Sequence, residues 1–99
     1  MQITVTDVPD RERFEARDGD TLAGFVTYQL TGNIIAYTHT EVDPAYEGKG
    51  IGSTLARAVM DDARDSGRTV VPICPYLSKW LVKHPEYEPI VARTTRKFR

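Results

Sequence analysis

The stretch EVDPAYEGKGIGSTLARAV, residues 41–59, joins a β-branched segment to an amphipathic one through a loop with glycine at positions 48, 50 and 52. Glycine has no Cβ, so Gly50 and Gly52 allow the backbone to approach a ligand closely. The loop opens a predicted helix, whose first N–H groups are free and lie at the positive end of the helix dipole. Because Lys49 adds a cation, we predict an anion-binding loop. The alternative is a tight strand-to-helix turn that binds nothing.

The residues after this loop have the period of an amphipathic helix, because apolar side chains recur every three or four positions. Gly67, in the sequence SGR, is predicted to end that helix in the left-handed conformation. The expected buried face consists of Ile51, Leu55, Ala56, Val59, Met60 and Ala63.

The residues before the loop alternate in polarity, which is typical of β-strands. The expected strands are QITVTDV (2–8), RERFEAR (11–17), TLAGFVTYQL (21–30) and NIIAYTHTEV (33–42). The sequence DGD (18–20) is a strong hairpin signal, because an Asp-Gly turn tolerates positive φ. The fourth strand has Ile34, Ala36 and Val42 on one face and Ile35 and Tyr37 on the other, so we expect a central strand covered on both sides.

After the helix, TVVPIC (69–74) is expected to be a short buried strand, and PYLSKWLVKHPEY (75–87) a second helix that starts at Pro75. The predicted order is β-β-β-β-α-β-α, an α/β (α+β) fold with an antiparallel meander followed by α-β-α. A helical crossover makes the last strand parallel to the strand before the loop if the two are neighbours.

The composition is that of one folded domain of 99 residues, 40% hydrophobic, with a net charge of −1. We expect a compact domain over 1–92 and a basic C-terminal tail over 93–99. The single cysteine, Cys74, cannot form an internal disulfide, which fits a reducing cytoplasm. Because charged residues occur throughout the first twenty residues, we expect neither a signal peptide nor a membrane-spanning helix there. The sequence lacks the overall basic character that would favour nucleic-acid binding, so we expect no nucleic-acid partner. We also expect no association with a membrane.

The loop matches neither the phosphate loop of NTPases nor the dinucleotide fingerprint. Instead, VDPAYEGKGIGSTL resembles the acetyl-CoA loop of GNAT-type N-acetyltransferases, [RQ]-x-x-G-x-[GA] after a strand ending in V-x-P. Glu47, Gly50 and Gly52 take the first, fourth and sixth positions, and Glu47 departs from the usual Arg or Gln. The segments YTHTEVDP, GKGIGSTL, VVPICPY and HPEY extend the resemblance to the small single-domain subgroup along almost the whole chain.

This resemblance implies a sheet whose two parallel strands splay apart to admit acetyl-CoA. The loop amides would then bind the CoA pyrophosphate, and the end of the strand before the loop would form hydrogen bonds with the pantetheine arm. Pro72 favours the splay, because proline removes a ladder hydrogen bond. Lys79, Lys83 and the basic tail are candidates for the CoA 3′-phosphate. The expected cofactor-binding residues are Glu41, Val42, Glu47, Gly48, Lys49, Gly50, Ile51, Gly52, Ser53 and Thr54.

Three side chains are candidates for catalysis, and no metal is expected. Cys74 directly precedes Pro75 at a helix N-cap, where a thiolate is stabilised. The resemblance makes it the candidate nucleophile, and the alternative is a buried inert cysteine. His39, which by alternation shares a strand face with Tyr37 and Glu41, is a candidate base or a structural histidine. Tyr76 either protonates the departing CoA thiolate or lines the pocket.

The predicted activity is therefore transfer of an acetyl group from acetyl-CoA to a primary amine, directly or through an acetyl-Cys74 intermediate. The acceptor is a small molecule or a protein, and the sequence does not specify it or the oligomeric state. The alternative is a non-catalytic module that binds CoA or acetyl-CoA as a sensor or regulatory subunit.

Overall fold

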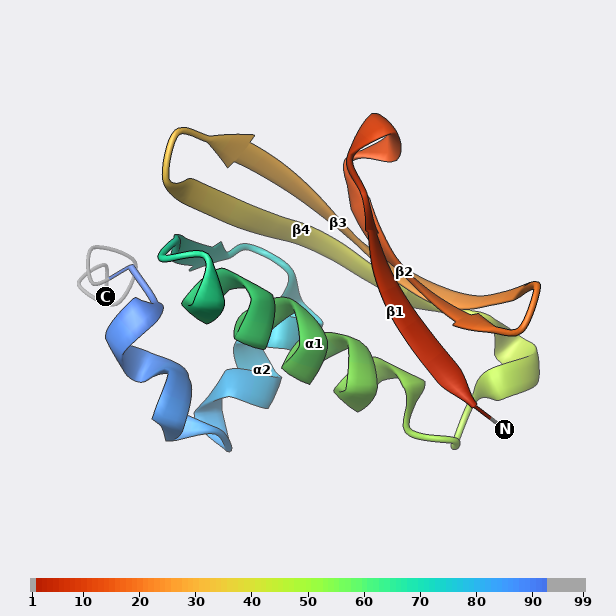
Figure 1. The fold of residues 1–99 in the computed structure, drawn as a ribbon. Helices are drawn as coiled ribbons and strands as arrows, with labels where there is room; N and C mark the ends of the chain where they lie inside the picture. Colours follow the sequence, from red (N-terminus) through yellow and green to blue (C-terminus); the bar gives the residue numbers. More distant parts are fainter. Residues whose placement is uncertain (1, 93–99) are drawn as a thin grey trace.

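The structure is a computed structural model that describes residues 2–92, so the basic tail lies outside the described residues. Its strands and helices follow the predicted order (Figure 1). They are β1 (Ile3–Val8), β2 (Arg13–Asp18), β3 (Thr21–Thr31), β4 (Ile34–Val42), α1 (Ile51–Asp65), β5 (Thr69–Pro72) and α2 (Pro75–Val82), with 3₁₀ turns at Pro9–Arg11, Pro44–Tyr46 and Pro85–Ile90.

The five strands form one mixed sheet in the order β1-β2-β3-β4-β5. The first three pairings are antiparallel, and β5 runs parallel to β4 after the crossover through α1. Gly19 has a φ of 61° in the turn between β2 and β3, so the Asp-Gly hairpin is confirmed.

Helix α1 buries the predicted face. Ile51, Leu55 and the four other apolar residues named above are all buried against the sheet. Gly67 follows the helix with a φ of +70°, as its sequence predicts. The local period of the sequence thus determines which side of α1 contacts the core.

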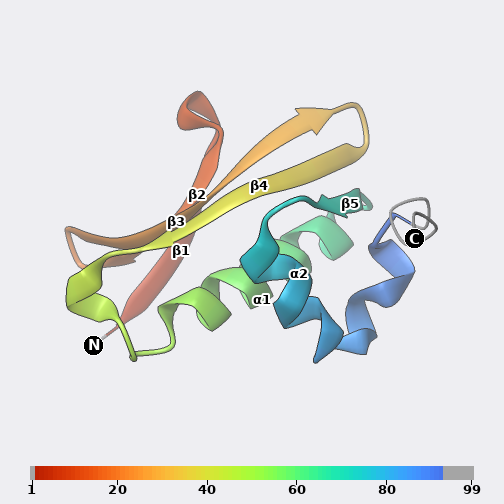
Figure 2. The same cartoon turned by 180° about the vertical axis from the view of Figure 1, so that it is seen from behind.

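Within residues 2–92 the sheet is covered on one face, not on both as the apolar pattern of β4 led us to expect. Figures 1 and 2 show α1 and α2 on the same side of the sheet. Ile35 and Tyr37 point to that side and are fully buried, whereas Ile34 is 49% exposed. The apolar side chains on the second face of β4 therefore do not indicate a second helical layer within residues 2–92.

A β-bulge in β4 changes the faces that its side chains occupy. Thr27 pairs with His39 and Tyr28 pairs with Tyr37, so Thr38 has no residue of its own opposite it. Tyr37 consequently faces the helices, while His39 lies on the open face. The predicted sharing of a face by His39 and Tyr37 is wrong for this reason.

Helix α2 is shorter than predicted and ends at Val82. Pro85 supplies no backbone N–H and restricts the residue before it, so the chain continues instead as the 3₁₀ turn Pro85–Ile90. His84 stacks on Trp80 with ring centroids 3.6 Å apart, and its Nδ1 donates to the Trp80 carbonyl over 2.7 Å. His84 thus has a packing role here.

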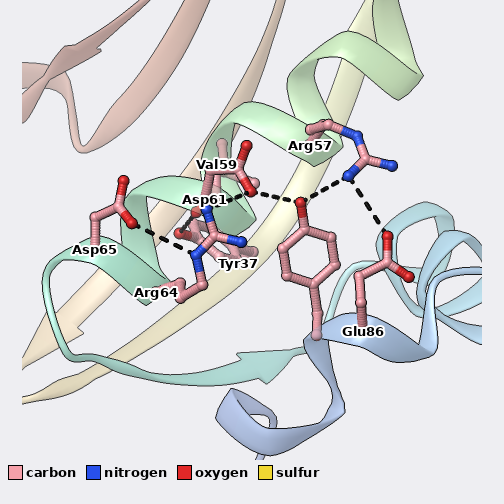
Figure 3. A network of polar contacts seen from close by, with 8 residues as sticks. Tyr37, Arg57, Val59, Asp61, Arg64, Asp65 and Glu86 are labelled. Carbon is pink, nitrogen blue, oxygen red and sulfur yellow. Dashed lines mark hydrogen bonds and ion pairs between the residues drawn. The ribbon is translucent and has the colours of Figure 1, made fainter.

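A polar network joins the last 3₁₀ turn to α1 (Figure 3). The Tyr87 hydroxyl donates to Asp61 over 2.5 Å and accepts from Arg57 over 3.0 Å. Arg57 also pairs with Glu86 at 3.5 Å, and Asp61 with Arg64 at 3.3 Å. These contacts hold the 3₁₀ turn Pro85–Ile90 against the exposed side of α1.

Candidate functional site

Strands β4 and β5 separate as the resemblance implies. Their pairing ends at Tyr37 and Pro72, although β4 continues to Val42. Beyond that point the N–H groups of Ile73 and Cys74 both donate to the Tyr37 carbonyl, over 3.1 and 2.9 Å, and the chain turns into α2 (Figure 2). In the part of the chain that the structure describes, the last five residues of β4 therefore have no strand partner on the β5 side.

The glycine loop ends in a helix N-terminus with free donors. Gly48 and Gly50 have φ values of 79° and 80°, a region that residues with a Cβ rarely adopt. The first bond of the helical ladder is Thr54 N–H to the Gly50 carbonyl, at 3.0 Å. The N–H groups of residues 50–53 precede this bond and form the donor set that suits an anion.

These donors border a cavity of about 260 Å³. Most of the predicted cofactor residues contribute to it, but Glu41, Lys49 and Thr54 do not. Tyr46 is a lining residue that sequence reasoning missed, since a single aromatic residue before the glycines carries no recognisable signal. The complete lining consists of Val42, Tyr46, Glu47, Gly48, Gly50, Ile51, Gly52, Ser53 and Tyr76.

Tyr76 lies directly over the first turn of α1. A Cβ added at Gly52 would be only 2.7 Å from the Tyr76 hydroxyl oxygen, so the Tyr76 side chain takes up the space that a larger residue would need unless that side chain shifted. Burial, and secondarily the nearby Cys74, raise the pKa of the Tyr76 hydroxyl. From the same helix, Trp80 Nε1 donates to the Ser53 hydroxyl over 3.0 Å. Helix α2 thereby forms one wall of the loop cavity.

Cys74 is the N-cap residue of α2, as predicted, and is only 2% exposed. Its thiol donates to the Thr40 hydroxyl over 3.2 Å. Thr40 belongs to the part of β4 that has separated from β5. No local signal identifies Thr40, because its inward orientation follows from the bulge at Thr38.

His39 and Glu41 lie on the open face of the sheet, opposite Thr40 and Cys74. His39 Nε2 is 3.1 Å from a Glu41 carboxylate oxygen, with both side chains more than half exposed. The Phe25 ring is 6.2 Å from the imidazole. The structure therefore brings His39 together with Glu41 but leaves it on the other side of the strand from the thiol.

Among residues 2–92, no group of three or more histidine, cysteine or acidic side chains is arranged to hold a metal ion. Within the same residues, no helix has the length and apolar character needed to span a membrane.

Comparison with known proteins gives consistent results. The family model for the GCN5-related N-acetyltransferases matches residues 13–90. The chain is 31% identical to protein NATD1 of Mus musculus over 77 residues, which is 76% of this chain and 70% of that protein. It is 40% identical over 60 residues to N-alpha-acetyltransferase RimI of Mycobacterium tuberculosis, covering 57% of this chain but only 38% of RimI.

The fold has a counterpart among solved structures. The solution structure of a GCN5-like protein from Staphylococcus aureus superimposes with a TM-score of 0.69, covering 90% of this chain and 87% of that one at 23% sequence identity. The family match, the splayed strands and the glycine loop agree: the chain belongs to the GCN5-related N-acetyltransferase family.

Proposed function

We propose that the chain transfers an acetyl group from acetyl-CoA to a primary amine. The observation that carries this proposal is the position of the gap. The strands separate beyond Tyr37 and Pro72, and Cys74 lies at that point. The free N–H groups of residues 50–53 follow the far end of β4. A thioester bound along this path would have its diphosphate on the loop and its acetyl group near Cys74.

The residues present fit such a ligand. The loop amides supply hydrogen bonds to a diphosphate. On the unpaired edge of β4, Val42 offers main-chain groups to the amides of a pantetheine arm, whereas the Glu41 carbonyl lies toward Gly24 of β3. Glu47 is exposed at the loop, where its negative carboxylate would repel a bound anion. Binding therefore depends on backbone donors and not on the side chain at this position.

Two chemical routes use these groups. In direct transfer, the amine nitrogen attacks the thioester carbon, the C–S bond breaks, and the CoA thiolate leaves. In the two-step route, the Cys74 thiolate attacks first and releases the CoA thiolate. The amine then attacks acetyl-Cys74, whose C–S bond breaks to release the Cys74 thiolate. In both, the Tyr76 hydroxyl, which is neutral at neutral pH, is the proposed proton donor to the departing thiolate.

His39 is the proposed base in direct transfer. Its imidazole is exposed on the open face and is oriented by Glu41 at 3.1 Å, so it accepts a proton from an amine that approaches from that face. A role in deprotonating Cys74 would require the ring to act across the strand.

A module that binds CoA without catalysing transfer is the second candidate. Glu47 in place of Arg or Gln and the burial of Cys74 favour it. Turnover with any amine in a panel of polyamines, amino acids and peptides would exclude this candidate.

The deciding experiment combines calorimetry with intact-mass measurement. Wild-type protein is expected to bind acetyl-CoA saturably, and Gly50→Trp to lose binding, because a side chain is strained at a φ of +80° and fills the loop cavity. Failure of the wild-type protein to bind would refute the proposal.

The intact mass after incubation then separates the two routes. One added acetyl group, absent in Cys74→Ala, supports the two-step route. Binding and turnover without that adduct support direct transfer, and binding without either supports the module.

A further inference from the structure

A cavity of about 250 Å³ lies between α2, the last 3₁₀ turn and the end of β5. It has no lining residue in common with the loop cavity, so it is separate from the predicted cofactor site. Its volume is below the roughly 300–1,000 Å³ of pockets for drug-sized molecules, so it suits a smaller ligand. The apolar part of its lining consists of Pro72, Leu81, Val82 and Val91.

The three polar side chains in the lining all present hydrogen-bond acceptors. The Ser78 hydroxyl donates to the Pro72 carbonyl over 2.8 Å, which leaves the lone pairs of its oxygen to accept. His84 Nδ1 donates to the Trp80 carbonyl over 2.7 Å, so Nε2 of the neutral ring can only accept. Glu88 adds a carboxylate, and in the described part of the chain no lysine or arginine lines the cavity.

Such a set of groups suits an ammonium ion. An ammonium group donates three hydrogen bonds and accepts none, which matches a site made of acceptors. Hydrogen bonds between charged groups are the strongest ones, so the Glu88 carboxylate would contribute most to its binding. The apolar walls, among them Leu81 and Val91, suit a hydrocarbon chain attached to the ammonium group. The chemistry of the cavity therefore favours an aliphatic amine.

An ammonium group bound in this way cannot be the nucleophile. A nearby carboxylate favours the charged form of an amine, and a charged nitrogen has no lone pair with which to attack a thioester. A substrate held here must therefore carry its reacting amino group elsewhere. Pro72 indicates where that group would lie, because it lines the cavity and is also the last residue of β5 that pairs with β4 before the strands separate.

We propose that this cavity selects an acceptor with two amino groups joined by an aliphatic chain. One ammonium group binds to Ser78, His84 and Glu88, and the chain follows the apolar wall toward Pro72. The inference rests on the proposed function, because it takes the gap beside Pro72 as the place of the acetyl group. It adds the chemical class of the acceptor.

The position of the cavity agrees with the two-step route. Helix α2, which lines the cavity, lies on the covered side of the sheet (Figures 1 and 2), whereas His39 lies on the open face. An amine from the cavity thus meets the gap on the side of Cys74. Its second, uncharged amino group attacks the carbonyl carbon of acetyl-Cys74 and forms the amide bond. The C–S bond breaks, and the departing Cys74 thiolate takes up the proton that the nitrogen loses.

The test uses α,ω-diaminoalkanes of increasing length and monoamines of matched length as acceptors from acetyl-CoA. Mass spectrometry measures the products formed by wild type, Glu88→Gln and Glu86→Gln. Glu86 belongs to the same 3₁₀ turn but pairs with Arg57 and does not line the cavity, so Glu86→Gln is the matched control. We expect the best diamine to exceed its matched monoamine in kcat/KM by about tenfold, the effect of one hydrogen bond to a charged group.

The advantage of the diamine should depend on one carboxylate. Glu88→Gln should remove it, and Glu86→Gln should keep it. Equal kcat/KM values for diamines and monoamines at every length would overturn the inference, as would an advantage that survives in Glu88→Gln.

Calorimetry with the same diamine separates this inference from the proposed function. Suppose that wild type binds the diamine, that Glu88→Gln binds it about tenfold more weakly, and that no amine is acetylated. The cavity is then an amine site, and the proposed function is refuted. Acetylation of monoamines without any binding of the diamine would overturn this inference and leave the proposed function in place.

Discussion

The Sγ atom of Cys74 lies 3.2 Å from Oγ1 of Thr40, across the point where β4 and β5 separate. A hydroxyl group accepts a hydrogen bond from a thiol and donates one to a thiolate. Thr40 can therefore hold the sulfur in the same place in both protonation states. This contact links the proposed nucleophile to a residue with no signal in the sequence.

Replacing Thr40 by valine, which keeps the shape and removes the hydroxyl, should slow the reaction of Cys74 with a small neutral alkylating reagent by about tenfold near neutral pH, because the thiolate loses a hydrogen bond. The rate is measured from pH 6 to 10 by intact mass, and Cys74 is the only cysteine in the chain. Thr40→Ser should restore most of the rate. If the alkylation rates of Thr40→Val and Thr40→Ser had the same dependence on pH, the Thr40 hydroxyl would have no influence on the Cys74 sulfur.

Two glycine substitutions should differ in their effect on stability. In Gly24→Ala the new Cβ would lie 2.7 Å from the Glu41 backbone oxygen, which cannot move alone, so we expect a loss of about 1–3 kcal/mol. In Gly52→Ala the near atoms are the hydroxyl and ring of Tyr76, a partly exposed side chain that can shift, and alanine favours the helix by up to about 1 kcal/mol. Urea unfolding measures both, and equal losses would contradict this account.

Acid should weaken the cluster formed by Glu15 with Arg13 and Arg17. Burial alone would raise the pKa of Glu15, but its hydrogen bonds to the two guanidinium groups, at 2.8 to 3.1 Å, outweigh burial and lower it below 4.5. The stabilisation is therefore present above pH 4.5 and is lost as the pH falls through the lowered value. Glu15→Gln should cost about 2 kcal/mol at pH 7.

Wild type and Glu15→Gln together also test the direction in which this stabilisation changes with pH. Urea unfolding at pH 7, 5 and 3 should show the difference between wild type and Glu15→Gln shrinking on the acid side. A constant difference over that range would show that the charge of Glu15 does not carry the stabilisation.

Alkali should weaken the contact between β4 and α1. The Tyr37 hydroxyl donates to the Val59 carbonyl over 2.6 Å, and burial raises its pKa well above the ordinary value of 10.0. The neutral phenol therefore stabilises the fold fully below pH 10, and this contribution is lost as the pH rises toward the raised pKa. Tyr37→Phe should be about 1 kcal/mol less stable at pH 8. By thermal unfolding at pH 8 and 10.5, the variant should lose less stability than wild type, and an equally steep loss would refute the assignment.

Local sequence patterns predicted most of the fold. The four strands expected within 2–42, the Asp-Gly turn and the buried face of α1 depend on side chains a few residues apart, and the structure confirms them apart from the faces of β4 beyond its bulge. The end of α2 could have been read locally as well, because Pro85 lies inside the expected helix. The glycine loop was found in the same way, since Gly48 and Gly50 require positive φ.

The sequence by itself determined the order of the elements, the inward face of α1 and the position of the loop, because each follows from a periodicity of two or about four residues or from the conformational freedom of glycine. Only the tertiary structure decided which face of β4 carries His39, that Thr40 meets Cys74, and that Tyr76 covers Gly52. These relationships depend on one unpaired residue in a ladder and on contacts between segments more than twenty residues apart. Short-range patterns do not encode such packing.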